Sequence, residues 1–346
     1  MFHKSGAETA ESAAGNAPVT SPVPGTEVPR SEFSSGRANG TGPDERCLRG
    51  EGGEPAARPG NHAILRAAMR NIRLTVAYDG TEYHGWALQP NHRTIQGTLV
   101  EVAERLTGER VFLLGAGRTD AGVHALGQTA SFKTRAGLST EEFLRAFNAL
   151  LPAAIRVLRC EEESPDFQPR WKAQAKTYQY RIYRGRIVPP FEQRYVLHYP
   201  FPLDEQAMSR AAGLFEGKHD FTAFAASTAG EEEGKQKEPM REILKAEIGR
   251  VRRGSIWSKT FATAGEDGGP GEELVFTVRG RSFLRFMVRK MTGTLLEIGR
   301  GRLAAEDILR LYESRDRSAA GPTVPPQGLF LVEVEYPDQW AVKSGE

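Results

Sequence analysis

Cysteine and long apolar runs are both scarce in this sequence. Its 346 residues include two cysteines, Cys47 and Cys160, and neither belongs to a Cys-x-x-Cys pair or a cluster of cysteine and histidine. This usage argues against a zinc site and is typical of the reducing cytoplasm, where we expect the protein to reside. No apolar segment approaches the ~20 residues needed to span a bilayer, and the N-terminus lacks the apolar stretch of a secretory signal. A membrane protein and an exported protein are therefore not expected.

A strong charge of either sign is also lacking. The formal net charge is +2, which by itself neither favours nor excludes a nucleic-acid partner. Residues 1–68 hold 7 Lys or Arg and 8 Asp or Glu, which leaves 39 and 36, a net charge of +3, for the rest of the chain. Any basic surface must therefore come from local clustering. One such cluster comprises Arg279, Arg281, Arg285, Arg289, Lys290, Arg300 and Arg302, although solvated surface is the ordinary role of any single member.

The chain divides by composition. Residues 1–62 contain 10 of the 37 glycines and 7 of the 21 prolines, without a periodic apolar pattern. We therefore expect residues 1–68 to be a disordered leader, and Met69, where the character of the sequence changes, is a candidate initiator. An N-terminal α+β domain over 69–168, a C-terminal α+β domain over 169–337 and a tail over 338–346 are predicted to follow.

Beyond the leader, the sequence shows the apolar periodicity of strands and that of helices. Alternating apolar residues over 72–78 predict a half-buried strand. Thr94 is a candidate N-cap for a helix that Gly108 ends, and Ser139 with Glu142 forms a capping box ahead of the next helix. Further helices are predicted over 204–217, 283–298 and 304–312, further strands over 111–114, 128–132, 154–160, 176–184, 242–251, 273–279 and 329–336, and a loop tip at 265–271. This irregular interleaving indicates an α+β fold with mainly antiparallel sheets.

The most distinctive segment is Gly115–Ala125, with the sequence GAGRTDAGVHA. It places Asp120 beside Arg118 in a glycine-rich turn between two predicted strands, where sheets commonly present reacting groups. A carboxylate held in this way is a candidate nucleophile. An Asp next to Gly is otherwise a turn former or a helix cap. A dinucleotide-binding fingerprint is excluded, because Asp120 occupies the place of the third glycine and a strand follows.

Four segments together resemble the signature of the tRNA pseudouridine synthase A family. In the family's order they are Tyr78–Trp86 with Gln89 and Gln96, Arg118–His124, Lys176–Tyr180 and Gly280–Arg289. The match spans residues 69–337. Two departures, a longer stretch over 252–271 and Ala87-Leu88 after Trp86, do not touch the proposed chemistry.

The resemblance implies a fold and a reaction. The fold is the pseudouridine synthase fold, in which two similar domains contain mainly antiparallel sheets flanked by helices. The reaction is isomerisation of uridine to pseudouridine at positions 38, 39 and 40 of the tRNA anticodon stem-loop, with no cofactor and no metal. The implied enzyme is a homodimer that binds tRNA across both subunits.

The resemblance also implies roles for the catalytic residues. Asp120 is expected to be the nucleophile, and the sequence does not distinguish attack on C1′, attack on the pyrimidine ring or removal of a sugar proton. Arg289 is expected to lie against Asp120 and to lower its pKa. Arg118 is placed to support a nucleotide extruded from the stem, with bracing of its own loop as the alternative.

Substrate binding is expected to involve one tyrosine and two arginines. Tyr178 resembles the family's tyrosine that stacks under the flipped uracil, whereas Tyr180, two residues on, is expected to pack in the core. Arg281 and Arg285 flank the start of the predicted helix that carries Arg289, and we expect them to contact tRNA phosphates.

Two other functions are weighed against this one. A non-catalytic RNA-binding module on the same scaffold is disfavoured because Arg118, Asp120, Tyr178 and Arg289 are all present. A glycosidase or phosphatase using Asp120 is disfavoured because no second carboxylate and no metal cluster can be placed at any motif.

Overall fold

The computed structural model describes residues 68–226, 238–252 and 272–340. The chain divides into two units, Met1–His62 and Ala63–Glu346, and all the elements below belong to the second. The predicted leader, apart from Ala68, and the stretch over 253–271 with its loop tip lie outside the described residues.

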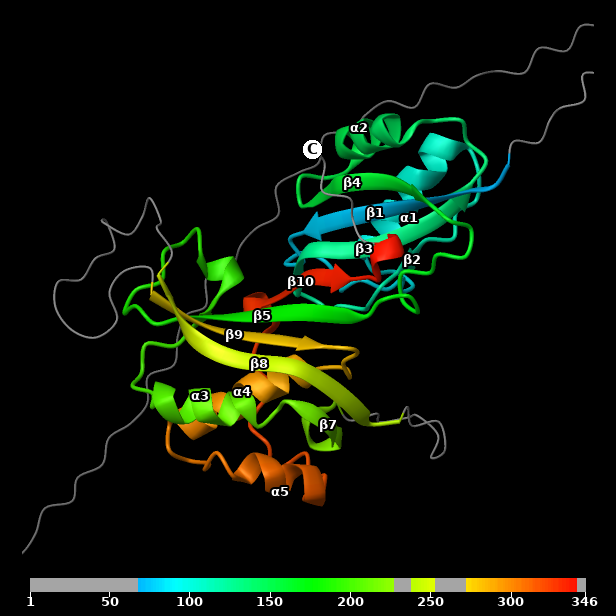
Figure 1. Ribbon diagram of the computed structural model, residues 1–346. Helices are drawn as coiled ribbons and strands as arrows, with labels where there is room; N and C mark the ends of the chain where they lie inside the picture. Colours follow the sequence, from blue (N-terminus) through cyan, green and yellow to red (C-terminus); the bar gives the residue numbers. More distant parts are fainter. Residues whose placement is uncertain (1–67, 227–237, 253–271, 341–346) are drawn as a thin grey trace, which may run out of the picture. The chain divides into compact units, whose positions relative to one another are not determined.

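A ten-stranded sheet runs through the described residues (Figure 1). Its order is β4 (Ile155–Glu163), β1 (Arg70–Tyr78), β3 (His124–Thr134), β10 (Leu329–Glu335), β5 (Ala175–Tyr183), β9 (Glu272–Gly280), β8 (Met240–Arg252) and β7 (Gly217–Asp220). Two short strands complete it, β2 (Leu114–Gly115) beside β3 and β6 (Leu197–His198) beside β5. The β10–β3 and β5–β6 pairs are parallel, and the remaining pairs are antiparallel. The predicted α+β fold with a mainly antiparallel sheet is thereby confirmed.

Strand β10 comes from the C-terminal part of the chain and lies between β3 and β5 (red in Figure 1). It pairs in parallel with β3, where Phe330 is opposite His124, and antiparallel with β5, where Leu331 is opposite Tyr178. These pairings join the strand that follows Asp120 to the strand that carries Tyr178. The sheet is continuous across residue 168, so a division into two domains at that point remains a prediction.

Five α-helices occur in the described part of the chain: α1 (Ile95–Thr107), α2 (Thr140–Leu150), α3 (Glu205–Gly213), α4 (Met287–Gly299) and α5 (Asp307–Ser314). The predicted caps of α1 are confirmed, since the Thr94 hydroxyl accepts a hydrogen bond from the Gly97 amide and Gly108 is left-handed. Both ends of this helix are therefore set by local side-chain and backbone chemistry.

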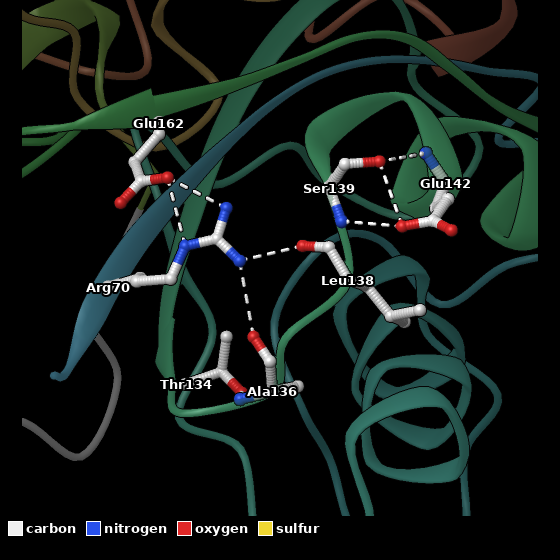
Figure 2. Close-up of polar contacts among 7 residues, drawn as sticks. All are labelled: Arg70, Thr134, Ala136, Leu138, Ser139, Glu142 and Glu162. Carbon is white, nitrogen blue, oxygen red and sulfur yellow. Dashed lines mark hydrogen bonds and ion pairs between the residues drawn. The ribbon is translucent and has the colours of Figure 1, made fainter. Parts of the chain in front are cut away.

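The start of α2 is fixed by the predicted capping box and by a neighbouring arginine (Figure 2). The Ser139 hydroxyl accepts from the Glu142 amide at 3.2 Å, and the Glu142 carboxylate accepts from the Ser139 amide at 2.8 Å. Arg70 of β1 donates to the Leu138 carbonyl at 2.6 Å and pairs with Glu162 of β4 at 2.7 Å. The Arg70 side chain thus links the start of α2 to β1 and β4.

The first half of β1 is buried on both faces, whereas Thr75 and Ala77 are only partly buried, so the prediction of a half-buried strand holds for the second half alone. Its apolar face is in the core, and the opposite face carries Arg73, which is only 2% exposed. The Arg73 guanidinium donates to Glu163 at 3.0 Å and to the Trp340 carbonyl at 2.6 Å. The short helical turn Asp338–Trp340 therefore forms part of the fold, although the sequence predicted a tail from residue 338.

Several predicted elements have different bounds, for example the helix predicted over 304–312, which is α5, and the strand predicted over 128–132, which is β3. The strand over 111–114 is reduced to β2, because the Val111 amide bonds to the Glu104 carboxylate of α1 and not to a neighbouring strand. Helix α4 begins at Met287, four residues after the predicted start, because Phe286 adopts a left-handed conformation with φ of 63°. Helix α3 ends at Gly213, and Gly217 begins β7.

Candidate active site

Asp120 lies on the predicted loop, between β2 and β3, and short contacts between backbones hold that loop in place. The Thr119 carbonyl accepts from the Trp86 amide at 3.0 Å, and the Thr119 hydroxyl is 2.8 Å from that of Tyr78. Gly85, at φ of +84°, allows this approach, since a Cβ there would lie 2.6 Å from the Thr119 oxygen. The glycines and Trp86 of the Tyr78–Trp86 motif therefore support the loop that carries Asp120.

Two arginines face the Asp120 carboxylate. Arg289 Nη1 lies 3.5 Å from Asp120 Oδ2, and Arg285 Nε lies 4.0 Å from Oδ1. The Arg289 side chain is 12% exposed and that of Arg285 is 73% exposed. The predicted neighbour of Asp120 is thus in contact with it, and Arg285, expected at tRNA phosphates, also reaches the carboxylate.

The pKa of Asp120 is raised above its usual value, although Arg289 lowers it as expected. Burial raises this pKa, and the positive charges of Arg289 and Arg285 lower it without cancelling the effect. A buried carboxylate loses hydration that ion pairs at 3.5 and 4.0 Å only partly replace. The result is a more basic carboxylate than an ordinary surface aspartate.

The position of Arg289 is determined by groups that the sequence did not suggest. Its Nε donates to the Val324 carbonyl at 2.7 Å. Its guanidinium lies 4.8 Å from the centre of the Phe286 ring, and the guanidinium of Arg285 lies 4.7 Å from it. Phe286 therefore contacts both arginines that approach Asp120, as expected for cation–π packing. Its positive φ is a strained conformation of the kind that occurs at functional sites.

Tyr178 is buried in β5 and its ring contacts Phe283 edge-on, with 4.9 Å between centroids. Burial raises the pKa of Tyr178, and the negative charge of Asp120 contributes in the same direction. Its hydroxyl forms no hydrogen bond with another described residue. Tyr180 is fully buried and donates to the Pro325 carbonyl at 2.7 Å, so its expected packing role is consistent with its position.

Arg118 and Arg281 occupy different surroundings. Arg118 is exposed and makes no hydrogen bond or ion pair with another described residue, so the contacts provide no evidence that it braces its loop. Arg281 pairs with Glu242 at 2.6 Å and is not among the charges that act on Asp120. Arg281 and Arg285, which were predicted together for substrate binding, therefore have different partners, Glu242 and Asp120.

Most cations of the predicted basic cluster form ion pairs or hydrogen bonds with other groups of the protein. Arg279 pairs with Glu335, and Arg300 and Arg302 both pair with Glu297. Lys290 donates to the carbonyls of Ala223 and Arg317. Within the cluster, Arg285 is the exposed member that faces the candidate site.

Among the residues that the structure describes, no group of three or more His, Cys, Asp or Glu is arranged to hold a metal ion. No helix in the same residues is long and apolar enough to cross a bilayer.

Comparison with known proteins identifies relatives over most of the chain. The family model described as tRNA pseudouridine synthase matches residues 74–172 and 211–337. A protein of Solibacter usitatus (strain Ellin6076) named tRNA pseudouridine synthase A is 45% identical over 268 residues, covering 78% of this chain and 100% of the relative. A protein of the same name from Caldicellulosiruptor bescii is 41% identical over 268 residues, with the same coverage of both chains. The chain therefore belongs to the tRNA pseudouridine synthase family.

Proposed function

We propose that the protein isomerises uridine to pseudouridine at positions 38, 39 and 40 of the tRNA anticodon stem-loop, with Asp120 as its nucleophile. It acts in the cytoplasm as a homodimer that binds tRNA across both subunits, and it needs no cofactor. The broader activity, that of a tRNA pseudouridine synthase and hence an isomerase, follows from family membership.

The observation that carries the role of Asp120 is its pairing with Arg289 at 3.5 Å on a loop braced by backbone contacts. Partial burial makes the carboxylate basic, and the two guanidinium groups favour its ionised form. These are the properties that a carboxylate nucleophile requires. Attack on C1′, attack on the ring and removal of a sugar proton all use the same group.

Other residues supply binding and extrusion. Tyr178 contacts the uracil ring next to Asp120. Two observations support this role: its hydroxyl has no hydrogen-bond partner among the described residues, and its ring packs against Phe283. Arg118 supports the nucleotide outside the stem, since enzymes that act on a stacked base must extrude it at a cost of a few kcal/mol. Arg285 contacts the backbone beside the target.

The direct test maps pseudouridine by reverse-transcription stops in tRNA incubated with the purified protein. We expect new stops at positions 38, 39 and 40 for wild type and none for Asp120→Asn, which keeps the volume of the side chain but is a far poorer nucleophile. Modification at other positions would contradict the proposed target. Turnover by Asp120→Asn would contradict the role of Asp120, and tRNA binding without turnover by wild type would favour a non-catalytic RNA-binding module.

A further inference from the structure

Lys176 of β5 is a buried cation beside the candidate site to which the function proposed above gives no role. It is 8% exposed and stands two residues before Tyr178, on the same face of the strand. Its Cε lies 3.6 Å from the point that a Cβ on Gly117 would occupy, and the Tyr178 hydroxyl lies 3.8 Å from that point. The Lys176 chain and the Tyr178 hydroxyl therefore meet at the loop that carries Asp120.

Lys176 has no anionic partner in the described part of the protein. Its ammonium group forms no hydrogen bond or ion pair with another described residue. Its Nζ is not fully buried, so the ammonium group retains contact with solvent. Burial lowers the pKa of Lys176 to about 8, and the positive charge of Arg170 acts in the same direction. An isolated buried cation is unfavourable unless another molecule supplies its partner.

The reaction itself produces a suitable partner. When the C1′–N1 bond breaks, its electron pair stays with the uracil ring, and O2 and O4 carry the negative charge. Addition of a carboxylate to the ring also places charge on a carbonyl oxygen. In attack on C1′, a bond from the Asp120 carboxylate to C1′ replaces the C1′–N1 bond. This new bond breaks when C5 bonds to C1′, which returns the negative charge from the ring to the carboxylate, after which C5 loses its proton to solvent and N1 gains one. Every route open to Asp120 thus passes through an anionic pyrimidine.

We propose that the ammonium group of Lys176 donates a hydrogen bond to a carbonyl oxygen of the target uracil and stabilises the negative charge of the detached ring. This inference rests on the proposed pseudouridine synthase activity. A tRNA phosphate is the less suitable partner, because Lys176 is almost fully buried next to Tyr178, whereas the exposed cations near Asp120 are Arg118 and Arg285.

The test compares Lys176→Met with wild type under single-turnover conditions. We expect the rate of pseudouridine formation to fall about 10²–10³-fold, as on removal of a donor to an oxyanion, while tRNA affinity changes less than threefold. Lys245→Met is the matched control, since Lys245 is exposed and pairs with Glu247 on the same strand, and it should match wild type in rate and affinity. The thermal midpoint of Lys176→Met should equal or exceed that of wild type, because the change removes an unpaired buried charge.

Three outcomes would overturn the assignment. An unchanged rate would exclude Lys176 from the chemistry. Weaker tRNA binding with a flatter salt dependence and an unchanged single-turnover rate would place Lys176 at a phosphate. A structural role would be shown if Lys176→Met had a lowered thermal midpoint and Lys176→Gln lost as much of the rate as Lys176→Met. Absence of pseudouridine formation by wild type would instead contradict the proposed function itself.

A substrate with sulfur in place of O2 or O4 of the target uracil identifies the contact. Sulfur accepts hydrogen bonds weakly, so wild type should be slowed by one of the two substitutions. Lys176→Met should show no additional loss with that same substrate, because the contact is already absent. If the rate losses from Lys176→Met and from sulfur substitution multiplied at both O2 and O4, a contact between Lys176 and the ring would be contradicted.

Discussion

At the scale of single residues, Asp120 combines two opposing influences. Burial makes its carboxylate more basic and removes the water that would otherwise solvate it, whereas Arg289 and Arg285 favour the ionised form. A fully hydrated aspartate would be a weaker base, and a buried aspartate without arginines would be protonated more readily. The arginines therefore make burial compatible with a nucleophilic role.

The raised pKa of Asp120 predicts how Asp120→Asn changes stability with pH. The folded protein holds the Asp120 proton more tightly than the unfolded chain, so the stability that Asp120 contributes is present below its unfolded pKa and is lost as pH rises through the folded pKa. Asp120→Asn should therefore be more stable than wild type at pH 7, and the difference should shrink as the solution is acidified. Thermal unfolding at pH values between 4 and 7 measures this, and a variant less stable than wild type at pH 7 would contradict it.

The position of the acidic limb of the pH–rate profile should depend on the arginines that lower the pKa of Asp120. Arg289→Met removes the positive charge that lowers the pKa of Asp120 most, so this pKa rises further and kcat/KM should be lost at a higher pH than in wild type. Arg285→Met should shift the limb less, because Arg285 is farther away and mostly exposed. Arg281→Met is the control and should leave the limb in place, since Arg281 pairs with Glu242. Equal profiles for Arg289→Met and wild type would exclude Arg289 as the partner of Asp120.

Residue-level prediction from the sequence succeeded where it depended on the motif and failed where it depended on burial. The resemblance indicated that Arg289 meets Asp120, and the two are in contact. Arg289 lowers the pKa of Asp120 as expected, but burial raises this pKa by more, and the amount of water removed from a loop is a property of the whole fold. Lys176 was visible in the motif, and its spacing of two from Tyr178 was the signal for a shared strand face.

At the scale of elements, helix α4 depends on the segment that follows α5. A Cβ on Gly293 would lie 1.8 Å from the Pro322 carbonyl oxygen, so the helix and the segment are in backbone contact. The Gly321 amide also donates to the Thr294 hydroxyl at 3.0 Å. This contact brings the Val324 carbonyl within reach of Arg289, so the packing of one glycine determines the geometry at Asp120.

Gly293→Ala should therefore affect both stability and catalysis. The methyl group overlaps the Pro322 backbone, which cannot rotate away as a side chain can, so a loss of about 1–3 kcal/mol in the free energy of unfolding is expected. The displaced Val324 carbonyl should also lower kcat. Gly213→Ala in α3 is the matched control: no atom lies within 4 Å of its Cβ position, so it should be neutral or stabilising by about 0.5–1 kcal/mol. Chemical denaturation and single-turnover kinetics test both variants.

Elements with local signals were predicted more accurately than those shaped by distant contacts. The ends of α1 follow from Thr94 and Gly108, which act through atoms a few residues away. The start of α4 was missed because Phe286 is held in a left-handed conformation while its ring contacts two arginines. No propensity predicts that conformation for a phenylalanine.

At the scale of the whole molecule, the candidate site depends on a pairing between distant parts of the chain. The Asp120 loop precedes β3, whereas Tyr178 and Lys176 lie on β5, and β10 pairs with both strands. The sequence predicted these strands but not their order, since strand order is determined by contacts between residues far apart in the chain. The sequence therefore predicts which residues form the candidate site but not how they are arranged.

The distribution of free charge over the molecule predicts the salt dependence of tRNA binding. Arg285 is mostly exposed, and within the described ranges its nearest carboxylate is that of Asp120 at 4.0 Å, whereas Arg281 is neutralised by Glu242 at 2.6 Å. Arg285→Ala should flatten the slope of log affinity against log salt by roughly 0.7–0.9, the contribution of one phosphate contact. Arg281→Ala should change the slope little.

Glu242→Gln provides the complementary change, because it should free Arg281 for a phosphate and make the slope steeper. Filter binding of whole tRNA at several salt concentrations measures all three variants under identical conditions. Equal slopes for wild type and Arg285→Ala would show that Arg285 is solvated surface with respect to tRNA. The exposed Arg118 would then be the next residue to test, since it lies on the Asp120 loop and has no partner among the described residues.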